Sequence, residues 1–135
     1  MRSPGTFQRI DGAAQLFTAG AAPKYLYSNA ILTNKTMPGT LSCKVAATAK
    51  TSTLTIAATW QVSDDGSTYI DAVSPNNPAD VVLVTGSGTS ATVTKCVTAP
   101  NLLGFKYARV KLTTGTGSAD GTDDGATLSV RYVKA

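Results

Sequence analysis

The sequence predicts an all-β fold, an antiparallel β-sandwich or jelly-roll-like single domain. Residues 53–63 alternate strictly, with apolar side chains on one parity and small, mostly hydroxylated ones on the other. The apolar row consists of Leu54, Ile56, Ala58, Trp60 and Val62. Successive side chains of a strand point to opposite faces, so we expect this row to be buried and the other row to face outward.

Two further observations favour the same fold class. The turn Asp64-Asp65-Gly66 and the segment 67–70 follow at once, which is typical of a β-hairpin. All 8 acidic residues are Asp, so the helix former Glu is missing while Thr, Val and Gly are abundant. The sequence therefore indicates strands joined by turns rather than helices.

The elements follow in order along the chain. Residues 1–13 contain Pro4, Gly5 and Gly12 and have little periodicity, so we expect an extended N-terminal arm before a sandwich domain over 14–135. A short strand is expected at 15–18. In 24–32 apolar residues occupy both parities, which predicts a strand covered on both faces, for example by a partner subunit. Further strands are expected at 40–50, 53–63, 67–72, 80–84, 89–97, 105–114 and 126–133.

The composition fits one folded domain. The chain has 135 residues, 42% of them hydrophobic and 15% charged, with a formal net charge of +4 spread over isolated Lys and Arg residues. This excess favours acidic partners in general. No apolar stretch has the length of a signal-peptide core or of the ~20 residues that span a membrane, so we expect synthesis in a cytosol.

The two cysteines differ in their surroundings. Cys43 is in register with Leu41 and Val45 and is expected to be buried. For Cys96 the sequence does not decide between the buried and the outward face of its strand. Reduced thiols are favoured for a cytosolic product, and a single bridge stays an alternative.

The sequence argues against an enzyme and predicts no cofactor. With no His and no Glu, the usual general base and metal ligand are missing. The Asp-rich turns offer oxygens for calcium, but they lack EF-hand spacing, so we interpret them as ordinary turns. The same interpretation covers the echo of Asp64–Thr68 at Asp123–Thr127. The acids concerned are Asp64, Asp65 and Asp71 in one group and Asp120, Asp123 and Asp124 in the other.

One strand carries aromatic and basic side chains on a single face. Phe105, Tyr107, Arg109 and Lys111 alternate with Ala108, Val110 and Leu112. Such a face can stack and neutralise single-stranded nucleic acid. Because no basic groove accompanies it, we favour solvent-facing strand residues with a subunit contact.

Three runs together suggest a family. Residues Thr59–Tyr69, Tyr107–Leu112 and Asp124–Tyr132 resemble segments of small β-sandwich virion proteins of tailed bacteriophages. The resemblance implies a capsid decoration (cement) protein on the capsid surface of the virion, made in the host bacterial cytoplasm. It further implies binding between capsomers, with the major capsid protein and copies of itself, as a homotrimer, for partners. No active site, membrane or specific nucleic acid is implied.

Alternatives remain open: a tail or neck accessory, a receptor- or glycan-binding module, or a single-stranded nucleic-acid-binding domain. For the decoration protein, the arm 1–13 and segment 25–32 are the expected intersubunit or capsid contacts, and the aromatic residues of 105–111 are expected at a subunit contact. The candidate contact residues are Arg2, Phe7, Arg9, Tyr25, Tyr27, Ile31, Phe105, Tyr107 and Arg109.

Overall fold

The computed structural model describes residues 7–33, 39–72, 81–99 and 105–134. Within these ranges the chain forms strands and turns, and it contains no helix long and apolar enough to cross a membrane. The all-β class is confirmed.

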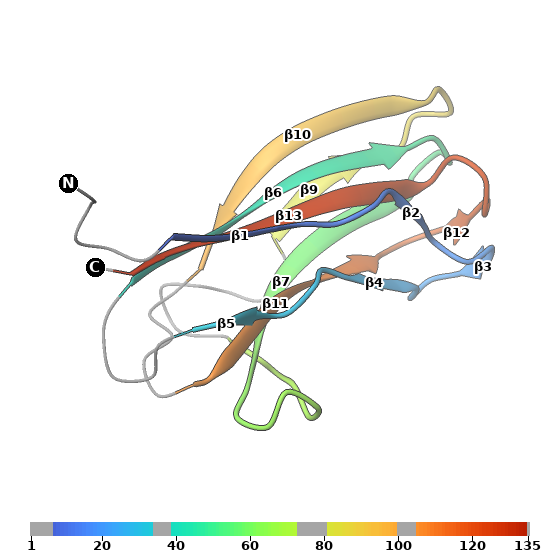
Figure 1. Ribbon diagram of the computed structural model, residues 1–135. Coiled ribbons are helices and arrows are strands. Elements are labelled where there is room, and N and C mark those ends of the chain that lie inside the picture. Colours follow the sequence, from blue (N-terminus) through green and yellow to red (C-terminus); the bar gives the residue numbers. More distant parts are fainter. Residues whose placement is uncertain (1–6, 34–38, 73–80, 100–104, 135) are drawn as a thin grey trace.

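Two antiparallel sheets lie face to face (Figure 1). The first has the order β1 (Phe7–Asp11), β13 (Gly125–Lys134), β6 (Gly39–Ala49), β10 (Ala91–Thr98), and β2 (Gln15–Leu16) also pairs with β13. The second has the order β4 (Tyr25–Tyr27), β11 (Tyr107–Thr114), β7 (Thr55–Ser63), β8 (Ile70–Asp71); β5 (Ile31–Leu32) also pairs with β11 and β9 (Val81–Thr85) with β7. A small ladder joins β3 (Gly20–Ala21) to β12 (Ser118–Ala119).

The topology is a nested hairpin rolled into a sandwich. Strand β1 pairs with β13, β4 and β5 pair with β11, β6 pairs with β10, and β7 pairs with β8 and β9. Each pair thus encloses the next along the chain, and successive pairs alternate between the two sheets. This is the arrangement of a jelly roll, as the strand pattern predicts.

The core lies between the sheets. Alternate residues of β6, β7, β11 and β13 point inward, and Trp60 is the largest of the fully buried side chains. The predicted apolar row of β7 is confirmed, since each member is at most 2% exposed.

The opposite row of β7 was expected to face outward, and that expectation is wrong. Thr59, Gln61 and Ser63 are 3%, 7% and 3% exposed. Strand β7 is central in its sheet, and side chains from β8, β11 and the 64–69 loop cover its outer face. The strand also begins at Thr55 rather than at Thr53, because Thr53 has φ 67°, a left-handed conformation that ends extended structure.

The N-terminal segment differs from the expected arm. Over Phe7–Asp11 it is the edge strand β1, paired with β13 from Phe7↔Val133 to Asp11↔Ser129. Residues 1–6 lie outside the described part of the chain, and the division into arm and domain at residue 13 stays a prediction.

Segment 24–32 is not one continuous strand. Residues 28–30 separate β4 from β5, and Ser28 Oγ accepts a hydrogen bond from the Val110 N–H at 2.8 Å. The interruption shifts the parity, so Leu26 and Ile31 both face the core whereas Tyr25, Tyr27 and Leu32 are exposed. The two-sided apolar pattern thus arises from a parity change within one chain.

The second Asp-Gly copy is not a hairpin turn. The side chain of Asp124 is 0% exposed and accepts hydrogen bonds from Lys50 N, Thr51 N, Thr51 Oγ1 and Asp120 N at 2.6, 3.2, 2.6 and 3.0 Å. Asp124 therefore joins two loops, and the left-handed glycine of this region is Gly121, with φ 78°. Within the described residues no group of three metal-ligating side chains is brought together.

Candidate functional site

The outer surface of the second sheet gathers aromatic and basic side chains. We call it the tyrosine–arginine face: Tyr25 and Tyr27 of β4, Tyr69 of the loop before β8, and Tyr107, Arg109 and Lys111 of β11. These positions follow from register, because β11 lies between β4 and β7 and presents every second side chain outward.

Arg109 is the centre of this face. Its guanidinium carbon lies 4.1 Å from the ring centroid of Tyr27 and 3.8 Å from that of Tyr69. Its Nε donates a hydrogen bond to Gln61 Oε1 at 2.9 Å, and Gln61 is its cross-strand partner on β7. The arginine is therefore held flat between two rings, a geometry that suits a planar guanidinium and not an ammonium.

Polar contacts extend from Gln61 to two further side chains, Asp71 and Lys111. Gln61 Nε2 donates to Asp71 Oδ1 at 3.0 Å, and Lys111 Nζ lies 3.1 Å from the same oxygen. The hydrogen bond from Gln61, followed by Lys111, lowers the pKa of Asp71. Lys111 Nζ also lies 5.7 Å from the ring centroid of Tyr25. The polar side chains of the face are thus paired with one another, and they leave the rings as its contact surface.

The rings remain accessible despite these contacts. Tyr25 and Tyr27 are 47% and 40% exposed, and their rings stack with centroids 6.5 Å apart and planes at 22°. Tyr and Arg are enriched in protein interfaces, and Tyr brings large contact area with little side-chain entropy to lose. This face is therefore suited to binding another surface.

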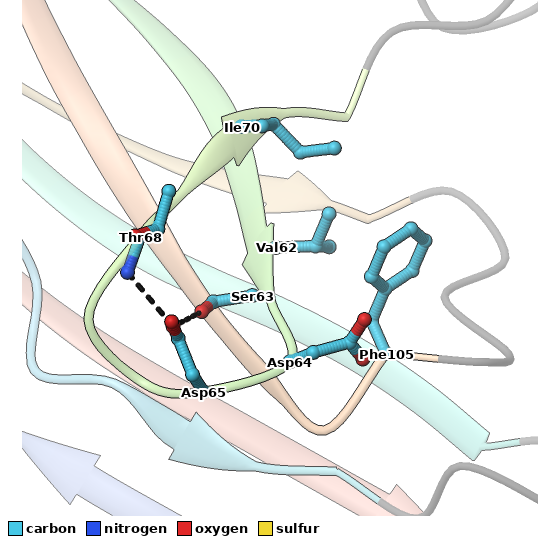
Figure 2. A pocket seen from close by; sticks show the side chains of 7 residues that line it. All are labelled: Val62, Ser63, Asp64, Asp65, Thr68, Ile70 and Phe105. Atoms are coloured by element: carbon cyan, nitrogen blue, oxygen red, sulfur yellow. Dashed lines mark hydrogen bonds between the residues drawn. The ribbon is translucent and has the colours of Figure 1, made fainter.

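A hollow of about 230 Å³ adjoins the face where β7 ends (Figure 2). Phe105, Val62 and the exposed Ile70 form its apolar side, and Asp64 and Asp65 lie on the hairpin loop beside it. Hydrogen bonds from the Thr68 and Ser67 N–H groups and from Ser63 Oγ lower the pKa of Asp65. Asp65 therefore caps the turn, as its position before Gly66 predicts.

The loop is fixed against the face by close packing. Gly66 has φ 76°, and a Cβ built on it would lie 3.2 Å from the Tyr107 ring. Glycine is needed here both for the left-handed turn and for this approach. The loop thus brings Tyr69 onto Arg109.

The structure brings four of the predicted contact residues together on this face: Tyr25, Tyr27, Tyr107 and Arg109. Phe105 lines the adjoining hollow. Ile31 is 0% exposed in the core, so the prediction of a surface contact there is wrong.

The remaining predicted contacts lie elsewhere. Arg9 is on the outer surface of the first sheet, Phe7 is described only by its backbone pairing in β1, and Arg2 is outside the described residues. Tyr69, Gln61 and Asp71 were not predicted as part of the site. Their only sequence signal is their nearness to the Asp-Gly turn, which returns the chain beside β7.

Comparison with known proteins shows the fold. No family model and no curated protein matches the sequence. Solved structures from infectious bursal disease virus do match. The VP2 subviral particle aligns with a TM-score of 0.60 and 12% identity over 96% of this chain and 32% of that chain. The Gx strain structure aligns with a TM-score of 0.59 and 10% identity over 97% of this chain and 32% of that chain.

These neighbours are viral capsid proteins, and the sandwich domain is of the kind found in them. The present chain spans about a third of their length. At this level of identity the likeness establishes the β-sandwich and leaves the activity to be argued from the site. The expected origin in a tailed bacteriophage stays a prediction.

Proposed function

We propose that this chain is a non-enzymatic structural protein of a virion, a capsid decoration protein that attaches to a larger shell through the tyrosine–arginine face. The proposal rests on where the tyrosine–arginine face lies. It is part of a jelly roll, and nearly the whole of this chain aligns with part of a viral capsid protein. The fold supports the proposed class of protein, and the face supplies a means of attachment.

The geometry of the face favours binding over catalysis. Arg109, Gln61, Asp71 and Lys111 already satisfy one another, so no nucleophile or base among them is directed at an open position. Their mutual contacts hold Tyr27 and Tyr69 in place before any partner arrives. A preorganised surface loses less conformational entropy when it binds, which raises affinity without new contacts.

The proposed partners are the major capsid protein and other copies of the chain. A stable interface buries about 1,600 Å² in total. The tyrosine–arginine face with its adjoining hollow supplies one continuous part of such an area. A homotrimer placed between capsomers of a tailed bacteriophage is the proposed arrangement, with the capsid surface as its location.

The test uses particles that lack this chain. Purified protein is added and co-sedimentation is measured for the wild type and for the double variant Tyr25→Ala, Tyr27→Ala. Truncation of interface tyrosines costs ~2 kcal/mol or more at a hot spot, so we expect affinity to fall at least about tenfold. Leu16→Ala, which removes a side chain 53% exposed at β2, is the matched control. Equal binding by the double variant would refute attachment through this face.

A glycan-binding module is the competing function, and the exposed stacked pair Tyr25 and Tyr27 is the observation in its favour. Sugar rings can lie on such aromatic surfaces. A glycan array separates the two functions, because a decoration protein binds particles and no array component. Nucleic acid is disfavoured since Arg109 already covers one side of the Tyr27 and Tyr69 rings.

A further inference from the structure

We propose that the outer surface of the first sheet holds a carboxylate-binding site, formed by Arg9, Lys44 and Arg131, that receives an acidic segment of a partner protein. The site is separate from the tyrosine–arginine face and lies on the opposite sheet. It goes beyond the proposed function, because it gives the molecule a second binding surface of different chemistry.

The three cations come from neighbouring strands. Arg9 of β1 is the cross-strand partner of Arg131 on β13. Lys44 of β6 is the cross-strand partner of Ser129, the outward-facing residue of β13 that precedes Arg131. They surround a hollow of about 380 Å³, whose lining is Arg9, Asp11, Gly12, Lys44, Ala46, Thr127, Ser129 and Arg131. The three positive charges in this lining face one negative charge, that of Asp11.

The pairing of Arg9 with Arg131 is unfavourable without an anion. Gly12 N donates to Leu128 O at 2.8 Å, and hydrogen-bonded and non-hydrogen-bonded pairs alternate along an antiparallel ladder. Arg9 and Arg131 therefore form a non-hydrogen-bonded pair, in which Cα atoms are only about 4.5 Å apart. Like charges directly opposite each other destabilise a sheet.

Asp11 forms a hydrogen-bonded ion pair with Arg9 and has only a longer-range attraction to Arg131. Arg9 Nε lies 3.1 Å from both Asp11 oxygens. Arg131 Nε is buried and has no hydrogen-bond partner within the described part of the chain. A buried donor without an acceptor costs free energy, which adds to the cost of placing Arg131 opposite Arg9. The hydroxyl of Thr127 lies in the same lining, whereas the Ser129 side chain is already hydrogen-bonded to Asp11.

The chemistry favours a carboxylate over a nucleic-acid backbone. Arginine binds a carboxylate through charge-assisted, often bidentate hydrogen bonds. Nucleic-acid binding needs a positively charged track and aromatic rings for the bases, whereas this is one compact cluster whose described lining has no ring. An acidic protein segment therefore fits best.

The test uses a free probe, an acetylated and amidated hexa-aspartate peptide, titrated into the intact protein by calorimetry or NMR. We expect saturable binding to the wild type and about a fivefold or greater loss in Lys44→Gln, as one charge-assisted hydrogen bond disappears. Lys95→Gln on β10, which is exposed but absent from this lining, should stay within about twofold although it lowers the net charge equally.

Three outcomes would overturn the proposal: no peptide binding, equal losses in both lysine variants, or tighter binding of inorganic phosphate or oligo-dT than of the peptide. Arg131→Gln gives an independent readout without any ligand. Because it removes a like-charge pair and an unsatisfied donor, its melting temperature should match or exceed the wild type. A clear drop would show that Arg131 already has its partner. No particle is used, so these results do not depend on attachment through the tyrosine–arginine face.

Discussion

The guanidinium of Arg109 stacks on the ring of Tyr69, with its central carbon 3.8 Å from the ring centroid. Arg109 belongs to β11, whereas Tyr69 ends the loop that connects β7 to β8. The contact therefore fastens a hairpin loop onto the neighbouring strand and helps to cover Gln61 beneath it. Burial raises the pKa of the Tyr69 hydroxyl, so this ring stays neutral beside the cation at physiological pH.

This stacking leads to the first prediction. Arg109→Lys keeps the positive charge but loses the planar group that fits between two rings. We expect the free energy of unfolding to fall by about 1 kcal/mol, as measured by chemical denaturation. Arg9→Lys is the control, since its ion pair with Asp11 is half exposed and contributes little. Equal stability of both variants would contradict a structural role for the stacked guanidinium.

The buried carboxylate of Asp124 should make the stability of the fold sensitive to acid. Burial acts to raise its pKa, but hydrogen bonds from Thr51, Lys50 and Asp120 outweigh burial and lower the pKa below 3.8. A lowered pKa means that the folded state binds the proton less readily than the unfolded state. The stabilisation is therefore complete above about pH 4–5, where the unfolded carboxyl is ionised, and is lost as pH falls through the folded pKa.

The corresponding variant is Asp124→Asn. We expect a loss of about 2–3 kcal/mol at pH 7, because an amide offers one acceptor oxygen where the carboxylate uses two. The pH dependence of unfolding should become flatter below about pH 5, as pH falls toward the lowered pKa of Asp124. Asp123→Asn, which breaks only an exposed ion pair with Lys50, is the neighbouring control. A slope unchanged from the wild type would argue against this role of Asp124.

The left-handed backbone at Thr53 offers a site for a stabilising substitution. It is the one non-glycine residue with positive φ in the described chain, and β-branched residues adopt that conformation at a cost. Asn tolerates left-handed backbone better, so Thr53→Asn should raise the free energy of unfolding by about 0.5–1 kcal/mol. Ser52 is exposed in the same turn, and Ser52→Asn is the matched control. A lower melting temperature for Thr53→Asn alone would contradict the strain argument.

The two thiols should react very differently. Cys43 is 0% exposed, and burial raises its pKa to about 12, whereas Cys96 is exposed on β10. A thiol reagent at pH 8 should therefore titrate one cysteine in the native protein and both after unfolding. Cys96→Ser should abolish the fast reaction. Two fast thiols, or none, would conflict with the separate environments of these side chains.

The strands were predictable where hydrophobic alternation is strong. In β6, β7, β11 and β13 a period of two residues marks the inward face, and the predicted ranges agree to within a few residues. The outer row of β7 could not be predicted, because its cover comes from Arg109 and a loop that folds back over the strand. Likewise β1 lacks a strong pattern of its own, and its pairing with β13 joins opposite ends of the described chain.

The candidate site was partly predictable for the same reason. Tyr107 and Arg109 share a face by simple parity, and the structure adds Tyr25 and Tyr27 through strand pairing. Ile31 was misplaced because the break that begins at Ser28 reverses the parity of the residues after it. Tyr69 reaches the site through the geometry of a six-residue connection between β7 and β8, which no local periodicity encodes.

The position of β13 affects how the chain acquires its fold. It lies between β1 and β6 and also pairs with β2, yet it is the last of the described strands to be synthesised. Until it leaves the ribosome, β1 has no neighbour and the first sheet lacks its middle. Contacts between residues so distant along a polypeptide form slowly. The sandwich can therefore close only once β13 has been synthesised, and unpaired β1 and β6 edges are the surfaces at risk of aggregation until then.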